Sequence, residues 1–293
     1  MLNKVVICGV GLIGGSFALG LKAAGAVREV VGMGRTRAPL EEAQTLGVID
    51  RIGIDWADAL NGADLVLLAM PVGQMAGVMV ALAPYLQAAT VVTDGGSTKG
   101  DVVAAARAAL GEKIDQFVPG HPIAGAEKSG VAAAQTGLYQ GRRVVLTPLK
   151  ENDGTAVNRV QSAWEACGAQ VSHLTPEEHD RVFAAVSHLP HLLAFALVHD
   201  LAGRDNSDQL FGFAAGGFRD FTRIASSHPE MWRDICVANR KALLAELDAY
   251  MAELMQTRVL LAGADSVGLE AMFAAARARR DAWLDSLKPL VEE

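Results

Sequence analysis

The sequence feature that most constrains the fold is a glycine-rich turn near the N-terminus. It follows a short apolar segment at residues 4–8, reads Gly9-Val10-Gly11-Leu12-Ile13-Gly14-Gly15, and leads into an alanine- and leucine-rich segment at 13–24. In a strand–turn–helix unit of this spacing, Gly9 permits the tight turn, Gly11 lets the backbone approach a pyrophosphate, and Gly14 allows close helix–strand packing. The N–H groups that open the helix would hold the phosphates. The turn therefore predicts dinucleotide binding by Gly9, Gly11, Leu12, Ile13 and Gly14.

Short β-branched segments alternate with helical segments through the first half of the chain. Strands are expected at 4–8, 29–33, 65–69, 90–93 and 143–147, and helices at 13–24, 40–46, 74–86 and 101–110. Such alternation predicts an α/β fold with a Rossmann-type doubly wound sheet.

The second half of the chain has a helical pattern. No strand is expected after about residue 168, and Thr175-Pro176-Glu177-Glu178 has the cap, the proline and the acidic first turn of a helix start. We therefore expect a dinucleotide-binding domain at 1–170, followed by an all-helical C-terminal domain at 171–293.

Charge and cysteine usage exclude several classes of protein. The chain has 33 acidic and 26 basic residues and a formal net charge of −7, whereas nucleic-acid binding relies on an excess of lysine and arginine. Cys8, Cys167 and Cys236 are far apart and odd in number, which predicts neither a disulfide framework nor a metal site and favours the reducing cytoplasm.

Membrane insertion and secretion are not expected either. No signal-like segment precedes the first strand, and the apolar stretch at 189–198 contains proline and histidine. That stretch is shorter than the ~20 residues of a membrane-spanning helix. We expect a cytoplasmic protein that binds no membrane, no nucleic acid and no metal.

The end of the second strand decides between the two nicotinamide cofactors. An NAD-binding chain usually places a carboxylate there, about 20 residues past the glycines, to hold the ribose 2′-hydroxyl. Here the carboxylate is missing, and Gly34 is followed by Arg35, Thr36 and Arg37. These side chains suit a 2′-phosphate, so NADP is favoured and NAD stays open. The alternative interpretation is a solvated basic loop.

Unusual polar density marks two segments that follow later strands. One reads Asp94-Gly95-Gly96-Ser97-Thr98-Lys99-Gly100, and the other runs from Gly120-His121-Pro122 to Gly130. Ligands of open α/β sheets lie outside the carboxyl ends of the strands, so both segments are expected to face the nicotinamide. Met70 and Pro71, at the end of the strand at 65–69, are expected to shape the turn beside it.

Six motifs in order make the chain resemble the prephenate/arogenate (cyclohexadienyl) dehydrogenase family. They are G-V-G-L-I-G-G at 9–15, D-G-G-S-T-K-G at 94–100, H-P-I-A-G-A-E-K-S-G at 121–130, V-S-H-L-P-H at 186–191, G-F-R-D-F-T-R-I-A at 217–225 and M-W-R-D-I at 231–235. The resemblance implies an oxidoreductase of tyrosine biosynthesis, which oxidatively decarboxylates prephenate or arogenate and passes a hydride to NAD(P) as the ring becomes aromatic. It also implies a homodimer formed through the helical domain.

The resemblance assigns roles to three catalytic-side residues. His121 matches the histidine that takes the proton of the substrate hydroxyl, and a histidine with its ordinary pKa near ~6.5 suits that task. Ser97 matches the serine that hydrogen-bonds the same hydroxyl, although it could also cap the helix that begins near Gly100. Arg223 matches the arginine that grips the ring carboxylate, for which a planar bidentate donor is suited.

Further residues are placed near the substrate and the cofactor by the same resemblance. His191 is expected near the substrate side chain. Glu127 and Lys99 are expected to support the site from behind the residues that touch the substrate, and Lys99 is also expected to bind the cofactor. Ala126 stands where many prephenate-using members have threonine, so a hydroxyl is missing beside the substrate side chain and the choice between prephenate and arogenate stays open.

The remaining histidines carry weaker signals. His188 is expected to orient the backbone or its neighbour in Ser-His-Leu-Pro-His. No motif surrounds His173, His179, His199 or His228, which are expected to be structural or exposed.

Two other functions fit part of the pattern. A β-hydroxyacid or imine dehydrogenase shares the order of a nucleotide domain and helices, but lacks the paired H-P-I-A-G and S-H-L-P-H motifs. A dinucleotide-sensing protein without turnover would need no convergence of Ser97, His121 and Arg223 on the nicotinamide.

Overall fold

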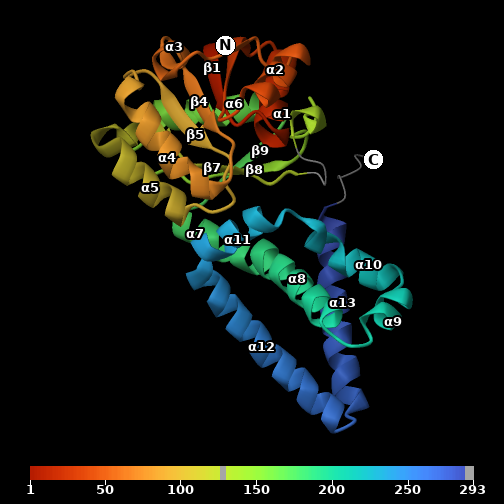
Figure 1. Ribbon diagram of the computed structural model, residues 1–293. Helices are drawn as coiled ribbons and strands as arrows, with labels where there is room; N and C mark the ends of the chain where they lie inside the picture. Colours follow the sequence, from red (N-terminus) through yellow and green to blue (C-terminus); the bar gives the residue numbers. More distant parts are fainter. Residues whose placement is uncertain (126–129, 288–293) are drawn as a thin grey trace, which may run out of the picture. The chain divides into compact units, whose positions relative to one another are not determined.

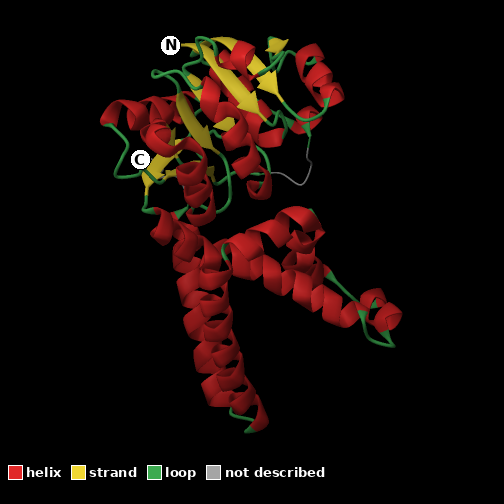
Figure 2. Ribbon diagram, turned by 60° about the vertical axis from the view of Figure 1, so that its left-hand side comes forward, coloured by secondary structure: helices red, strands yellow, loops and turns green. Residues whose placement is uncertain are grey.

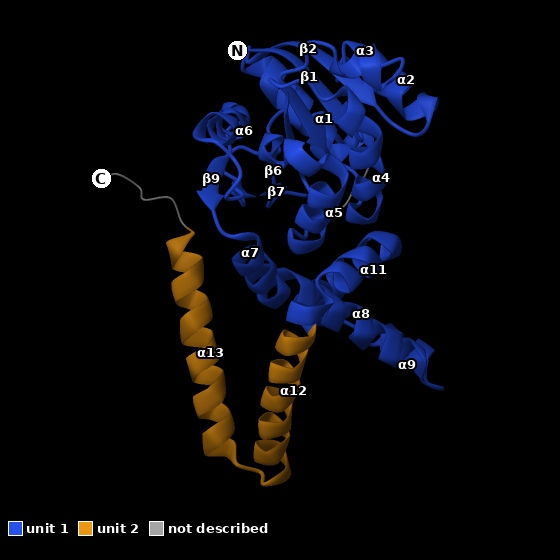
Figure 3. Cartoon of the chain, turned by 90° about the vertical axis from the view of Figure 1, so that its left-hand side faces the viewer, with its two compact units in different colours: residues 1–243 blue, residues 244–293 orange. Residues whose placement is uncertain are grey.

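The computed structural model describes residues 1–125 and 130–287. The chain divides into two compact units, Met1–Leu243 and Leu244–Glu293 (Figure 3). These units are defined by how densely the chain contacts itself. The functional border expected between residues 170 and 171 stays a prediction.

A six-stranded parallel sheet forms the centre of the first unit (Figure 1). Its strands are β1 (Leu2–Cys8), β2 (Val27–Met33), β3 (Arg51–Ile52), β4 (Leu65–Leu68), β5 (Val91–Asp94) and β6 (Phe117–Val118). Their order is β3-β2-β1-β4-β5-β6, and every neighbouring pair is parallel. The predicted Rossmann-type sheet is confirmed. Because the chain moves outward in opposite directions from β1 and β4, a crevice for a ligand is expected at their carboxyl ends.

The sheet is buried on both faces, which explains why its central strands are apolar without alternation. Val5, Ile7, Leu65 and Leu67 point into one core, and Val6, Cys8, Val66 and Leu68 point into the other. Helices α1 (Leu12–Ala23), α2 (Arg37–Thr45) and α6 (Gly154–Ala166) cover the first face, and α3 (Trp56–Leu60), α4 (Val72–Leu82) and α5 (Gly100–Leu110) cover the second.

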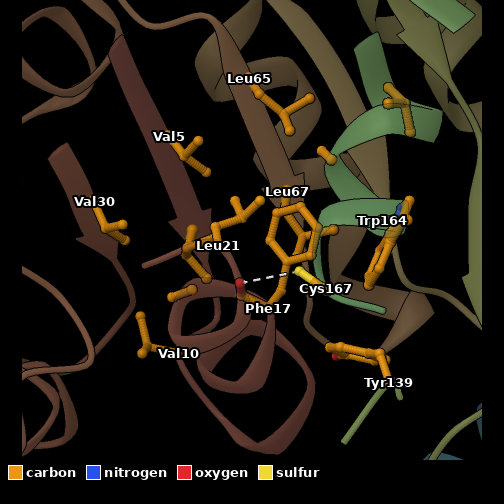
Figure 4. Close-up of a cluster of buried hydrophobic side chains, with 14 of the residues drawn as sticks. Val5, Val10, Phe17, Leu21, Val30, Leu65, Leu67, Tyr139, Trp164 and Cys167 are labelled. Carbon is orange, nitrogen blue, oxygen red and sulfur yellow. Dashed lines mark hydrogen bonds between the residues drawn. The ribbon is translucent and has the colours of Figure 1, made fainter. Parts of the chain in front are cut away.

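Aromatic packing joins α1 to α6 in the first core (Figure 4). The rings of Phe17 and Trp164 have centroids 4.4 Å apart, and Tyr139 lies against Trp164 at 5.0 Å. The thiol of Cys167 lies 3.6 Å from the carbonyl of Phe17. These contacts hold α6, which comes late in the chain, on the nucleotide-binding sheet.

A second, three-stranded sheet corrects three expectations. It consists of β7 (Gly120–Pro122), β8 (Arg143–Leu146) and β9 (Gln170–His173), with β7 antiparallel and β9 parallel to β8. The strand expected at 143–147 therefore exists outside the main sheet, a strand does follow residue 168, and His121 lies in a strand rather than a loop. β7 and β9 are short strands that depend on their pairing partners more than on their own sequence, so the pattern did not show them.

After β9, every regular element among the described residues is a helix or a helical turn (Figure 2). The elements are α7 (Pro176–Phe183), the π-helical turn η4 (Ala184–His188), α8 (Leu189–Ala202), α9 (Ser207–Gly212), α10 (Gly216–Thr222), the 3₁₀ turn η5 (Arg223–Ser226), α11 (Pro229–Ala238), α12 (Arg240–Ala262) and α13 (Ser266–Ser286). The predicted helix start is confirmed, because Thr175 and Glu178 form a reciprocal capping box with Pro176 in the first turn.

The helical run Pro176–Ala202 is longer than the apolar stretch suggested. It has 27 residues and is long and apolar enough, by length and composition only, to cross a membrane, so the expectation that it is too short is wrong. Its Asp180 accepts hydrogen bonds from the backbone of α5, and its His179 and His188 are buried in the first unit. A single helix that passes a test of length and composition is weak evidence for a membrane span.

Candidate active site

The glycine turn lies between β1 and α1, and the surroundings of each glycine differ in how much room they leave for a side chain. Gly9 has a φ of +92°, and a Cβ there would lie 2.5 Å from the carbonyl oxygen of Ala69. A Cβ on Gly14 would lie 2.4 Å from the carbonyl oxygen of Gly9, whereas a Cβ on Gly11 would meet nothing within 4 Å. Gly9 and Gly14 are needed by the fold, whereas the space beside Gly11 is open.

The start of α1 is suited to an anion. Gly11 is its cap, no side chain accepts a hydrogen bond there, and the first turn contains no acidic residue. The opening N–H groups and the positive end of the helix dipole therefore meet no competing carboxylate of this helix. Met70 reaches the same turn, since its backbone nitrogen would lie 3.2 Å from a Cβ on Gly9, and Pro71 caps α4.

The residues after β2 form an exposed basic loop. Arg35, Thr36 and Arg37 are all exposed, and Thr36 is the cap of α2, which begins at Arg37 rather than near residue 40. Arg37 is ion-paired with Glu41 one turn on, at 2.8 Å. Arg35 makes no ion pair within the residues that the structure describes. The loop thus presents Arg35 as an exposed cation just after the carboxyl end of β2.

The loop after β5 is fixed by a fully buried ion pair. Asp94 accepts a hydrogen bond from Lys99 Nζ, from the N–H of Gly96 at 2.8 Å and from the N–H of Gly120 at 3.0 Å. Lys99 also donates to the carbonyl of Gly120, at 2.7 Å. Burial raises the pKa of Asp94, and the Lys99 charge and these donors act against that rise. The pair clamps the loop that carries Ser97 to the strand that carries His121.

The position of Lys99 fits the supporting role expected of it. Its ammonium is buried between Asp94 and Gly120, so in this structure it positions the two site segments. A direct contact with the cofactor stays a prediction. Ser97 is half-buried and does not cap α5, whose cap is Lys99 without a side-chain hydrogen bond.

His121 lies on β7, half-buried, with one ring nitrogen engaged. Its Nδ1 is 2.9 Å from Nε2 of His179, and its ring lies 4.9 Å, centroid to centroid, from that of Phe183. Burial lowers the pKa of His121 well below the ordinary value, and His179, Lys99 and His188 add to the effect. His121 is therefore a neutral imidazole at physiological pH.

His179 and Asp180 extend this contact toward α5. Nδ1 of His179 is 2.9 Å from Oδ1 of Asp180, and that carboxylate accepts hydrogen bonds from the backbone N–H groups of Lys99 and Gly100, each at 2.8 Å. The expectation that His179 is merely structural or exposed is thus incomplete, because it is fully buried and contacts the proposed base.

A second group of aromatic side chains lies on the helices. His191 stacks on Trp232, with ring centroids 3.6 Å apart, and its Nδ1 is 2.9 Å from the carbonyl oxygen of Ser187. Burial lowers the pKa of His191, the hydrogen bond with Ser187 acts against that lowering, and the positive charge of Arg223 adds to it. Arg223 itself is exposed, on η5.

His188 joins the two groups. Its Nδ1 is 3.1 Å from Nδ2 of Asn239, and the same amide nitrogen donates to the carbonyl of Asp180 at 2.7 Å. Burial lowers the pKa of His188 to about 4, with Asp180 acting in the opposite direction. His188 is therefore a neutral ring at physiological pH, and the orienting role expected of it stays a prediction.

Contacts across the sheet bring the cofactor side and the catalytic side together. A Cβ on Gly95 would lie 3.2 Å from the side chain of Ile13 and 3.6 Å from Pro122, so the start of α1, the loop after β5 and the His121 strand meet at one place. Ala126 and Glu127 lie outside the described residues.

Sequence reasoning missed three residues of this arrangement: His179, Asp180 and Asn239. The adjacent His-Asp pair one turn after a capping box was a signal that could have been followed. Asn239 offered none, because its partners lie 51 and 59 residues away along the chain.

Comparisons with known proteins agree on one family. The model of the prephenate dehydrogenase nucleotide-binding domain matches residues 17–173, and that of the prephenate dehydrogenase dimerization domain matches residues 175–275. The chain is 38% identical to the prephenate dehydrogenase of Bacillus subtilis over 96% of this chain and 76% of the relative. It is 35% identical to the cyclohexadienyl dehydrogenase of Zymomonas mobilis over 90% of each.

A solved structure extends the similarity to the fold. Prephenate dehydrogenase from Aquifex aeolicus, in complex with hydroxyphenyl propionate and NAD+, aligns with a TM-score of 0.89 at 37% identity, covering 96% of this chain and 98% of that one.

Proposed function

Because the chain belongs to the prephenate dehydrogenase family of nicotinamide-dependent dehydrogenases, we propose that it oxidatively decarboxylates prephenate, arogenate or both. The products would be 4-hydroxyphenylpyruvate and tyrosine, respectively, in tyrosine biosynthesis. One observation carries the proposal: the loop with Ser97 and the strand with His121 meet the start of α1 at the switch point of the sheet.

The dinucleotide site fits the cofactor that this family uses. Gly11 leaves open space, α1 presents an uncapped N-terminus, and Met70 and Pro71 border the same turn. Gly9, Gly11, Leu12, Ile13 and Gly14 would hold the pyrophosphate. The nicotinamide, when bound, accepts the hydride from the ring carbon that bears the hydroxyl.

His121 would take the proton of that hydroxyl. A neutral imidazole is required for this step, and the lowered pKa of His121 supplies it. A weak base suffices, because the hydroxyl becomes strongly acidic as the hydride leaves its carbon. Ser97, half-buried on the neighbouring loop, would orient the hydroxyl.

Arg223 and His191 would hold the charged end of the substrate. The protein is acidic overall, with a net charge of −7, so an anionic substrate needs a local cation. Arg223 provides one beside His191, whose ring is kept neutral and fixed on Trp232. Glu127 and Ala126 remain proposed neighbours of the substrate.

NADP is the cofactor that the loop after β2 favours. It has no carboxylate for a ribose 2′-hydroxyl, and its exposed Arg35, Thr36 and Arg37 could bind a 2′-phosphate. The Aquifex aeolicus relative was solved with NAD+, so use of NAD by this chain is the competing outcome.

A homodimer in the cytoplasm is the proposed working form. The second matching family model is that of a dimerization domain, and the unit Leu244–Glu293 exposes large apolar side chains, among them Met255, Val259, Phe273 and Trp283. The free thiols of Cys8, Cys167 and Cys236 suit a reducing compartment.

Steady-state rates with prephenate and with arogenate, each with NAD and with NADP, test the proposal. At least one cyclohexadienyl substrate should be turned over, with NADP preferred. Turnover of β-hydroxyacids or imines alone would favour a dehydrogenase of that other class. Dinucleotide binding without any turnover would favour a sensor.

A further inference from the structure

A line of hydrogen bonds runs from the start of α5 to the ring of His121. The N–H groups of Lys99 and Gly100 donate to Asp180, each at 2.8 Å. Asp180 lies 2.9 Å from Nδ1 of His179, and Nε2 of His179 lies 2.9 Å from Nδ1 of His121. Every atom of this line belongs to the first compact unit, and neither His179 nor Asp180 has a role in the proposed function.

The ionised state of Asp180 sets the direction of every hydrogen bond in the line. Burial would raise the pKa of Asp180, but the hydrogen bonds from His179, Gly100 and Lys99 outweigh it, and the pKa is lowered. An ionised carboxylate only accepts, so Nδ1 of His179 must donate to it. A neutral His179 then has a free lone pair on Nε2, and Nδ1 of His121 must donate to that lone pair. The remaining nitrogen of His121, Nε2, is left as an acceptor.

We propose that His179 and Asp180 are positioning residues that hold His121 in the Nδ1–H tautomer and keep its Nε2 lone pair for the proton of the substrate hydroxyl. The inference rests on the proposed function of His121. In the step itself the substrate O–H bond breaks and an N–H bond forms at Nε2. The resulting imidazolium keeps its Nδ1–H bond to His179 and is stabilised through His179 by the charge of Asp180.

The charges around the line leave Asp180 as its main source of negative potential. From β5 and α5, Asp94 and Lys99 face the histidines as an ion pair, whose charges oppose one another. From η4, His188 is a neutral ring whose pKa is lowered to about 4. On α7, Asp180 raises the pKa of His179, although burial lowers it more. An aspartate that orients a catalytic histidine works in this way in serine proteases.

A purely structural role is the alternative interpretation. Asp180 also satisfies two N–H groups at the start of α5, so its loss could weaken the attachment of α7 without any effect on the tautomer of His121. His179→Gln separates the two roles, because it leaves the bonds between Asp180 and α5 in place.

The rate and its pH dependence test the proposal in the full-length enzyme. Asp180→Asn and His179→Gln should each lower kcat by ~10²-fold or more, with KM for substrate and cofactor changed by less than about threefold. The acidic limb of kcat should move to lower pH in Asp180→Asn, because a negative charge that favours the imidazolium is removed. Glu177→Gln, an exposed charge change on the same helix, should leave both the rate and the limb unchanged.

Two further measurements keep the test independent of folding and of the proposed function. In the His121→Asn background, Asp180→Asn should lower kcat no further, whereas a structural defect would lower it again. Nitrogen NMR of ¹⁵N-histidine-labelled resting enzyme should show His121 protonated at Nδ1, and Asp180→Asn should lose this preference. Protonation of His121 at Nε2 in the wild type would overturn the proposal. So would a wild-type kcat and a wild-type acidic limb in both Asp180→Asn and His179→Gln, if His121→Asn loses activity as expected. Wild-type turnover in His121→Asn would instead overturn the proposed function.

Discussion

The cofactor side of this site depends on the shape of the backbone, whereas the catalytic side depends on the charge and protonation of its side chains. The cofactor side is a single contiguous turn. In it Gly9 and Gly14 avoid clashes with the backbone, and Gly11 leaves open space. The catalytic side is assembled from β7, α7, η4 and the start of α5, and ionised or neutral side chains decide its state. Steric changes should therefore disable the first side, and changes of charge or proton position should disable the second.

The largest effect is expected on the catalytic side, from His121→Asn. Asparagine keeps a polar side chain but cannot take the hydroxyl proton, so kcat should fall by ~10²–10⁴-fold. Dinucleotide affinity, measured by titration of the intrinsic fluorescence, should stay near that of the wild type, because no part of the glycine turn is touched. Loss of affinity together with rate would show that the two sides are not separable.

The next effect is expected on the cofactor side, from Gly11→Ala. A methyl group here meets no protein atom within 4 Å, and the φ of −109° suits any residue, so the free energy of unfolding should stay near that of the wild type. Dinucleotide affinity should fall by ~10²-fold, because the space belongs to the pyrophosphate. Gly9→Ala is the matched contrast: its positive φ and its contact with Ala69 should weaken the fold itself. Unchanged cofactor binding in Gly11→Ala would remove this turn from the site.

Acid should destabilise the catalytic side before the cofactor side. His188 has a pKa of about 4 in the folded chain and His121 and His179 are lowered too, whereas unfolded histidines titrate near ~6.5. Below that pH the unfolded chain binds protons that the folded chain does not, so the free energy of unfolding falls as the pH falls. Above that pH these histidines are neutral in both the folded and the unfolded chain, so they do not change the free energy of unfolding.

Urea unfolding checks this sign. The contribution of His188 between pH 7 and pH 5 should be about 2 kcal/mol, and His188→Gln should lose that much less stability over the interval. An equal loss in wild type and variant would show that His188 is not held neutral in the folded chain.

The smallest effect is expected from Arg35→Ala. Arg35 is the part of the cofactor side that would act through a side chain and not through the backbone. Loss of one exposed arginine should raise KM for NADP by ~10-fold and leave KM for NAD nearly unchanged. Arg37→Ala is a matched control with a smaller expected effect, because Arg37 already pairs with Glu41. Equal changes for both cofactors would refute a phosphate-binding role for Arg35.

The same contrast explains what could be predicted from the sequence. The turn at Gly9–Gly14 is one contiguous segment, and the parallel sheet comes from strands and helices that alternate along the chain. Both could therefore be predicted from the order of the residues. His179 carries no motif, and its partner His121 lies 58 residues earlier in the chain, so only the fold could show their contact. β9 was missed for the same reason, since its pairing with β8 depends on tertiary context. The burial of Lys99 against Asp94 could not be read from D-G-G-S-T-K-G, because it depends on how the loop folds back on β5 and β7.

The reaction itself gives the most direct test of the central claim, that this site aromatises a cyclohexadienyl substrate at a nicotinamide. Wild-type enzyme should be incubated with prephenate or arogenate and NADP or NAD, and reduced cofactor, carbon dioxide and aromatic product should be measured together. Equal amounts of the three are predicted, and His121→Asn should form all three ~10²–10⁴-fold more slowly. Reduced cofactor without carbon dioxide, or no reduction with either substrate while another hydroxyacid is oxidised, would contradict it.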